Sequence, residues 1–500
     1  MNKTAIKNFA IWARNKLIAD ISYKAGLLGI TEKGINSPLP QSTQTVQFFD
    51  IGTKEPSSIT GLEIQQRKKL VEEIEKKAKQ SDYATAYKNV IEEVAYTWFN
   101  RLIAIRFMEV NDYLPTRIRV LSSESNGKAE PDLVTHALEA NFDYSAYEKD
   151  RIIQLKHENK LDELFRMLFV KQCNALNTNL PELFEKTSDY TELLLNISFT
   201  DKEGVVYHLA HDISEDDFNV SKEGQVEIIG WLYQYYNTEP KDETFALLKK
   251  NIKITKERMP AATQLFTPDW IVRYMVENSL GRLWIEGHPN EDLKSNWKYY
   301  LEEAIQEVDV QKELVKIREK YKAIKPEDIK VIDPAMGSGH ILVYAFDVLM
   351  QIYESQGYSQ RDAAKSIVEN NLYGLDIDNR AYQLAYFAVL MKARQYNRRI
   401  LNGETKCHVY AIQESDDINR NHLKYFGAGM SDMEKNSALL QIQGLLDTFI
   451  DAKEYGSILN VENYNWELLN NYIKFIDTNG QMSLDSIGVE YSKNQLTCLV

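Results

Sequence analysis

Residues 331–340 carry the pattern in this chain that is most typical of ligand chemistry. They read Val-Ile-Asp-Pro-Ala-Met-Gly-Ser-Gly-His, a short apolar strand followed by a glycine turn. Gly337 and Gly339 would let the backbone pass close to a ligand, where a Cβ would collide or restrict φ. The apolar run 341–355 predicts a helix whose free N–H groups and dipole favour a ligand at its start. The pattern therefore predicts a binding site where this strand ends.

A second strand ends on an acid that suits the same site. Residues 372–376 read Leu-Tyr-Gly-Leu-Asp, and a carboxylate at this place commonly binds ribose hydroxyls. Asp376 lies further from the turn than the roughly 20 residues of a dinucleotide site, and an extra helix at 361–371 accounts for the distance. Either acid alone reads as a solvated strand-end carboxylate, and a lone Gly-x-Gly is a weak signal. Their combination favours a nucleoside-cofactor pocket.

The elements around the turn alternate between strand and helix. This order is typical of an α/β fold with a parallel, doubly wound sheet. The strands are expected at 330–334, 372–376 and 407–412, and the helices at 341–355, 361–371 and 381–396.

The first half reads instead as helical. Apolar residues at helical spacing predict helices at 8–28, 63–79, 87–110, 149–158, 161–170 and 226–236. Residues 237–243 are polar and read as a break, and 259–262 read as a non-helical joint. We therefore expect a helical domain at 1–255 and a cofactor-binding domain at 256–500.

Further helices are expected in the second half. Thr267 is a good N-cap and Pro268 fits the first position of a helix that runs over 271–283. Residues 291–321 read as a charged helical stretch, and 437–452 and 465–475 also look helical. The aromatic residues of 226–236 could stack on bases, but core packing is the simpler interpretation.

The composition limits the classes of function. A length of 500 residues predicts two or three domains. The net charge of −14 argues against a protein that binds DNA with its whole surface. Basic stretches at 312–330 and 392–399 read as solvated helix faces. Three distant cysteines show no metal-type spacing, so we predict no metal site. Because no secretory signal or apolar run of about 18 residues is visible, we expect a cytoplasmic protein without a membrane partner.

Three motifs now support a family resemblance. Residues 333–340 resemble motif I of the amino-directed (adenine) DNA methyltransferases, residues 266–272 (Phe-Thr-Pro-Asp-Trp-Ile-Val) resemble motif X, and residues 373–378 resemble motif II. The order X, I, II is that of gamma-type enzymes. The aromatic segments 95–110 and 229–236 further resemble the PglX-type methyltransferases of BREX phage-defence systems. This resemblance implies a Rossmann-like domain, S-adenosylmethionine as cofactor, double-stranded DNA as partner and possible contacts with other defence proteins.

The resemblance also implies roles for single residues. Asp333 would face the methionine amino group, the glycine turn would pass beside its backbone, and Asp376 would accept the ribose hydroxyls. Ile377 would pack on adenine, the motif X residues would close the methionine end, and Gln413, Glu414 or Ser415 would approach the adenine amine. The expected cofactor-binding residues are Phe266, Thr267, Pro268, Asp333, Pro334, Ala335, Gly337, Ser338, Gly339, Asp376, Ile377, Gln413 and Glu414.

The chain departs from the family at the catalytic loop. Adenine methyltransferases use an Asn/Asp-Pro-Pro-Tyr/Phe loop that holds the exocyclic amine of the flipped base. No Pro-Pro pair occurs here, and Pro334 is the last proline. Residues 420–480 would be a helical insertion before that loop, with only part of motif III present. We therefore expect a fragment of a larger enzyme, inactive alone. The alternatives are a non-catalytic binding or docking module, and a methyltransferase acting on RNA or protein.

Overall fold

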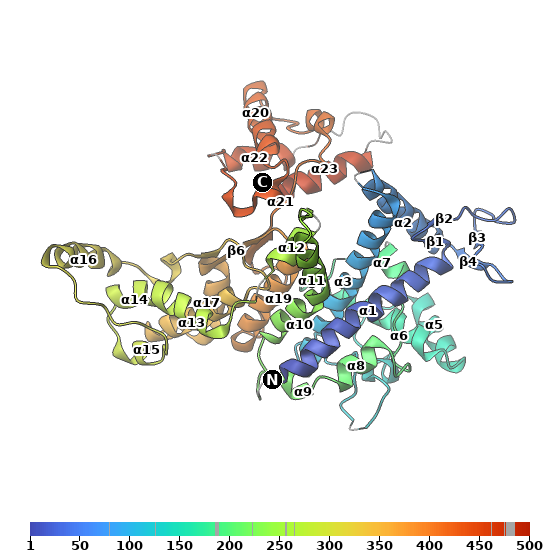
Figure 1. Cartoon of the computed structure of the whole chain (residues 1–500), viewed down its shortest axis with the longest axis horizontal. Helices are drawn as coiled ribbons and strands as arrows, with labels where there is room; N and C mark the ends of the chain where they lie inside the picture. The colour runs from blue at the N-terminus through green and yellow to red at the C-terminus, as the bar shows by residue number, and fades with distance from the viewer. Residues whose placement is uncertain are drawn as a thin grey trace.

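The computed structural model of the chain describes residues 1–79, 81–125, 127–185, 190–222, 224–255, 258–264, 266–461, 463–474, 476 and 486–500. Figure 1 shows the helices of the first half (blue to green) beside a small sheet with its own helices (orange). The elements α13 to α16 extend from the sheet on the side away from the first half, and the segment after β7 (red) forms a separate lobe.

The first half is helical, as its apolar spacing predicts. Its helices are α1 (Lys3–Leu27), α2 (Leu62–Ala78), α3 (Tyr83–Val110), α4 (Asp132–Thr135), α5 (Ala146–His157), α6 (Leu161–Leu176), α7 (Tyr190–Leu193), α8 (Val205–His211), α9 (Glu215–Phe218), α10 (Ile228–Tyr236), α11 (Thr238–Leu248) and α12 (Met259–Thr263). α3 is buried on every side along its second half, which is typical of a central helix. Each helix of this half that the sequence predicts is present.

Two short antiparallel hairpins in the first half were not predicted. β1 (Ile30–Thr31) pairs with β2 (Gly34–Ile35), and β3 (Val46–Phe49) pairs with β4 (Ser57–Thr60). Strands of two and four residues are too short to produce a readable alternation of apolar and polar side chains.

The break predicted at 237–243 and the non-helical joint predicted at 259–262 are both wrong. Thr238–Leu248 forms α11 and Met259–Thr263 forms α12. Each helix has a proline in its first turn, Pro240 and Pro260, where the missing N–H costs no helical hydrogen bond. The polar residues of 237–243 therefore begin a helix instead of separating two elements, and Pro260 likewise stands where a helix begins.

The helix predicted at 271–283 is present but begins differently. Helical backbone runs through α13 (Asp269–Val276), the π-turn η2 (Glu277–Gly281) and α14 (Arg282–Gly287). Thr267 is not the N-cap, because Pro268 occupies that position and no side chain caps the helix. Buried Glu277 accepts hydrogen bonds from the Tyr344 hydroxyl (2.6 Å) and the Tyr299 N–H (2.6 Å), which ties η2 to the helix after the glycine turn.

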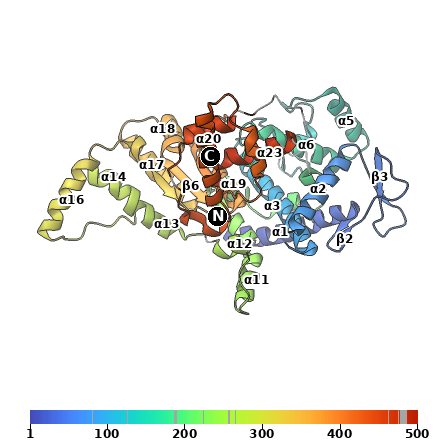
Figure 2. The same ribbon diagram turned by 90° about the horizontal axis from the view of Figure 1, so that it is seen from above.

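The single helical stretch predicted at 291–321 is also wrong. It consists of α15 (Glu291–Ser295) and α16 (Val308–Tyr321), joined by the non-helical residues 296–307, of which 301–307 are exposed. Charged side chains on both sides of the joint made the stretch look continuous. Figure 2 shows α16 at the end of the extension, far from the first half.

The second half contains the predicted small parallel sheet. β5 (Val331–Asp333), β6 (Leu372–Asp376) and β7 (His408–Ala411) lie in the order β5-β6-β7. The register pairs Val331 with Leu372, and Asp376 with Ala411. The connecting helices are η3 (Pro326–Asp328), α17 (His340–Ser355), α18 (Gln360–Ser366), η4 (Ile367–Asn371) and α19 (Asn379–Tyr396).

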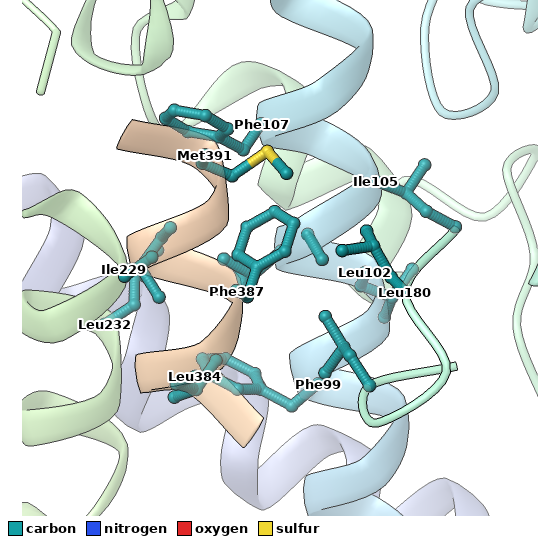
Figure 3. Close-up of a cluster of buried hydrophobic side chains, with 14 of the residues drawn as sticks. Phe99, Leu102, Ile105, Phe107, Leu180, Ile229, Leu232, Leu384, Phe387 and Met391 are labelled. Carbon is teal, nitrogen blue, oxygen red and sulfur yellow. The ribbon is translucent and has the colours of Figure 1, made fainter. Parts of the chain in front are cut away.

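The helical half packs directly on the helix α19 of the sheet. Figure 3 shows side chains of α3, α10 and α19 in one apolar cluster, with Phe387 at its centre. The rings of Phe107 and Phe387 meet edge to face at 6.1 Å. Buried apolar residues from Ile6 to Val409 form one contiguous core. The proposed division at residue 255 remains a prediction.

The segment after β7 has its own smaller core. Its elements are η5 (Arg420–Tyr425), α20 (Asp432–Thr448), α21 (Ala452–Tyr455), η6 (Gly456–Ile458), α22 (Trp466–Lys474) and α23 (Ser486–Leu499). The helices predicted at 437–452 and 465–475 correspond to α20 and α22, and residue 475 lies outside the described residues. α23 was not predicted. Along the described ranges we find no helix that is both long and apolar enough to cross a bilayer.

Candidate cofactor site

The glycine turn joins the end of β5 to the start of α17. Gly337 and Gly339 have φ values of 54° and 83°, in the left-handed region that glycine adopts without strain. A Cβ at Gly339 would come within 3.1 Å of Ala385 on α19, whereas one at Gly337 would meet nothing within 4 Å. Gly339 is the N-cap of α17 and no side chain caps this helix. The turn thus offers helix N–H groups beside open space.

Asp333 lies buried at the end of β5 with half of its carboxylate unsatisfied. Its Oδ1 accepts the Ala335 N–H at 3.1 Å, and its Oδ2 is buried without a hydrogen-bond partner among the described residues. Burial raises the pKa of Asp333, and the hydrogen bond from Ala335 only partly offsets this. Because an unpartnered buried acceptor is costly, this oxygen suits a positively charged donor such as an ammonium group. That this donor is the methionine amino group of S-adenosylmethionine stays a prediction.

Both carboxylate oxygens of Asp376 accept backbone N–H groups, and one of these belongs to the glycine turn. Its Oδ2 accepts the Gly337 N–H at 2.8 Å, and its Oδ1 accepts the Asp378 N–H at 2.8 Å. A carboxylate has about four acceptor positions, so two remain for ribose hydroxyls. Burial raises the pKa of Asp376. The two N–H bonds lower it, the nearby carboxylates of Asp378 and Asp333 raise it, and the net effect is a raised pKa. The two N–H bonds therefore define the orientation of the Asp376 carboxylate.

The motif X residues lie against the first residue of α17. The Phe266 ring stacks on His340 with centroids 4.4 Å apart, and the His340 Nδ1–H donates to the Thr267 carbonyl at 3.1 Å. Burial lowers the pKa of His340. Trp231 of α10 adds a ring 4.3 Å from Phe266. The structure thus brings motif X and motif I together, as their expected roles require.

Gly230 on α10 allows this close approach. A Cβ at Gly230 would collide with the Phe266 ring and would come within 2.8 Å of the Ser338 Oγ. Helix α10 of the helical half therefore packs directly against Phe266 of motif X and Ser338 of motif I. Sequence reasoning missed this glycine, since an isolated glycine within a helical pattern gives no sign of what lies against it.

The end of β7 carries the residues expected near adenine. Gln413 donates its side-chain amide to the Ala411 carbonyl (3.1 Å), and the Glu414 Oε1 accepts the Lys453 N–H (3.3 Å). A Cβ at Gly456 would lie 3.4 Å from Ile377. The segment α21–η6 therefore covers the ends of β6 and β7, which the sequence did not predict. Their contact with the adenine of the cofactor stays a prediction.

Comparison with known proteins now adds to this geometry. Residues 304–423 match the family model of the MmeI DNA-methyltransferase domain. The chain is 46% identical over 479 residues to the adenine-specific methyltransferase PglX of Lacticaseibacillus casei, covering 92% of this chain. The predicted resemblance to PglX-type methyltransferases is confirmed. The adenine-specific methyltransferase BrxX of Escherichia coli is 40% identical over 417 residues, covering 83% of this chain.

A more distant relative extends the likeness. A putative type II restriction enzyme and methyltransferase of Methanocaldococcus jannaschii is 24% identical over 305 residues, 57% of this chain. The chain spans 38% of the length of PglX, 33% of BrxX and 24% of the archaeal protein. The likeness is therefore to part of each relative.

Proposed function

We propose that this chain is the cofactor-binding part of an adenine-specific DNA methyltransferase of a BREX-type phage-defence system. The Oδ2 of Asp333, buried at the end of β5 where the glycine turn begins and without a hydrogen-bond partner among the described residues, carries the proposal. Support comes from the motif X residues stacked on the start of α17 and from the family match at residues 304–423. The proposed fold of the second half is Rossmann-like, with double-stranded DNA and other defence proteins as partners of the whole protein.

Each proposed role follows from the site. Asp333 would hold the methionine amino group, because its free oxygen needs a donor. Asp376 would accept the ribose hydroxyls with its two remaining lone-pair positions. Phe266, packed between Trp231 and His340, would shield the methionine end from water. Bound S-adenosylmethionine supplies an electrophilic methyl group on its sulfonium sulfur.

Methyl transfer itself is proposed for the whole protein. In the family a Pro-Pro loop holds the exocyclic amine of the flipped adenine, and no Pro-Pro pair occurs among these 500 residues. We therefore assign no residue here to the exocyclic amine of the target adenine in DNA. The alternative, a module that binds the cofactor without chemistry, is favoured by the same observation.

Calorimetric titration of the folded chain with S-adenosylmethionine tests the proposal. We expect saturable binding of one cofactor per chain. No binding by a chain that circular dichroism shows to be folded would overturn the assignment of the pocket. Transfer of labelled methyl groups to DNA is measured in parallel. We expect none from residues 1–500, and transfer by these residues alone would contradict the expected need for the Pro-Pro loop.

A further inference from the structure

Tyr233 in the helical half is bonded to the strand-end region of the candidate site. It lies on α10, buried, and its hydroxyl donates to the Asp378 Oδ2 at 2.9 Å across 145 residues of sequence. A phenylalanine would fill the same space, so packing alone does not require the hydroxyl. A buried tyrosine hydroxyl needs a partner, and here that partner lies two residues after Asp376.

The Asp378 carboxylate is held from two further directions. Its Oδ1 accepts the Arg380 backbone N–H (3.0 Å) and the Arg380 Nε–H (3.0 Å). The Arg380 guanidinium lies 4.9 Å from the centre of the Tyr96 ring on α3. Burial alone would raise the pKa of Asp378, but the charge and hydrogen bonds of Arg380 and the Tyr233 hydroxyl hold it below the usual range. Asp378 is therefore ionised at neutral pH and immobile.

Asp378 is in turn bonded to Asp376, the acid that is expected to bind the cofactor. Its backbone N–H donates to the Asp376 Oδ1, and the Asp376 Oδ2 accepts the Gly337 N–H, each at 2.8 Å. A carboxylate bonded at both oxygens keeps its plane fixed. The chain of bonds runs from Tyr233 through Asp378 and Asp376 to the glycine turn. Each member is a polar group inside or beside an apolar core, where such bonds are strongest.

We propose that Tyr233 and Arg380 are positioning residues that orient Asp376 toward the ribose of the cofactor. The helical half would then help to set cofactor affinity without touching the cofactor. This inference rests on the proposed function, because it takes the ligand of Asp376 to be a nucleoside with ribose hydroxyls.

The test replaces Tyr233 by phenylalanine and measures binding of S-adenosylhomocysteine and its 2′,3′-dideoxy analogue. The bond is present with and without ligand, so only the part of its roughly 1 kcal/mol that orients Asp376 affects binding, and S-adenosylhomocysteine should bind up to about fivefold more weakly. The analogue lacks the hydroxyls that Asp376 would accept, so its affinity should not change. A merely structural role of Tyr233 would weaken both ligands equally.

Tyr236→Phe is the matched control. Tyr236 lies on the same helix, is buried, and its hydroxyl has no hydrogen-bond partner in the part of the chain that the structure describes. Its removal should leave both affinities unchanged. Arg380→Gln serves as the second variant where Tyr233→Phe does not fold, and it should show the same selective loss.

The outcomes separate the two proposals. Selective weakening of S-adenosylhomocysteine supports the positioning role. Unchanged affinity in Tyr233→Phe, or equal weakening of both ligands, overturns it while cofactor binding by the unaltered chain stands. A folded, unaltered chain that binds neither ligand overturns the proposed function, and the positioning role falls with it.

Discussion

Replacing Asp333 by asparagine should weaken S-adenosylmethionine binding strongly while leaving the chain folded. Within the described ranges, the Asp333 Oδ2 is buried without a hydrogen-bond partner, and the other oxygen accepts the Ala335 N–H. An ammonium group placed there would make a charge-assisted hydrogen bond, worth about 1.5–3 kcal/mol. Asparagine keeps the shape and the bond to Ala335 but removes the charge. We expect an affinity loss of roughly 10- to 100-fold.

The same substitution should not lower the stability of the ligand-free chain. Burial raises the pKa of Asp333 above its value in the unfolded chain, so its ionised form opposes folding. This cost is present at neutral pH and is relieved as pH falls through the raised folded pKa. Asp333→Asn removes the cost at neutral pH. Its midpoint of thermal unfolding should therefore equal or exceed that of the unaltered chain, and the difference should shrink in acid.

Calorimetry at neutral pH and thermal unfolding between neutral and acidic pH measure both effects. Cofactor binding by the unaltered chain should also weaken as Asp333 protonates, and binding by Asp333→Asn should lack that acidic decline. Weak binding combined with a large loss of stability would show that Asp333 is structural. Unchanged affinity in a folded Asp333→Asn variant would refute the assignment of this carboxylate to the cofactor.

Three further predictions concern the surroundings of the turn. Asp376→Ala should weaken S-adenosylmethionine binding by about 1–3 kcal/mol in calorimetry, since the ribose hydroxyls lose a charged acceptor; unchanged affinity would contradict the assignment. Gly230→Ala should destabilise the chain by about 1–3 kcal/mol in urea unfolding, because the new Cβ meets Phe266 and Ser338. A stabilised variant would show that Phe266 moves aside freely. Phe387→Ala, at the centre of the cluster in Figure 3, should cost about 3–5 kcal/mol by the same assay. A cost below about 1 kcal/mol would mean that α19 does not bind the helical half through this ring.

The elements around the site were predictable because their local signals agree. The strand at 372–376 has the predicted bounds, and α17 differs from its prediction by one residue. Glycine at 337 and 339 marks the turn by its conformational freedom, and both residues do adopt positive φ. Periodicity likewise predicted the helices α1, α2 and α3. These are cases in which pattern, turn chemistry and packing require the same structure.

The wrong predictions concern residue types that occur both in loops and at the starts of helices. Residues 237–243 were predicted as a break because they are polar, and 259–262 were predicted as a non-helical joint, but both segments lie at the starts of helices, α11 and α12. Thr267 has the chemistry of an N-cap, but its carbonyl bonds to His340 and Pro268 takes the cap position. In each case the local sequence allows two conformations. Contacts with residues distant in the sequence, or a shift of the helix start by one residue, select between them.

The candidate site itself shows a further limit of sequence reasoning. Asp333 and Asp376 belong to motifs and were found, because each ends a strand beside the glycine turn. Tyr233 was recognised only as a member of an aromatic segment, and its burial agrees with the interpretation as core. Its bond to Asp378 spans 145 residues, which no periodicity reveals. Only the packing of α10 against α19 places that hydroxyl beside the carboxylate.

Through this packing the helical half contributes contacts to the proposed cofactor site. α10 supplies Gly230 beneath Phe266 and Ser338, and Tyr233 to the carboxylate next to Asp376. Both contacts depend on the apolar interface in which α3 and α10 meet α19. A substitution in that interface far from the turn should therefore lower cofactor affinity together with stability, whereas one on the extended α16 should change neither. The two halves of the chain then behave as one unit in cofactor binding, because the core that joins them also orients the residues of the site.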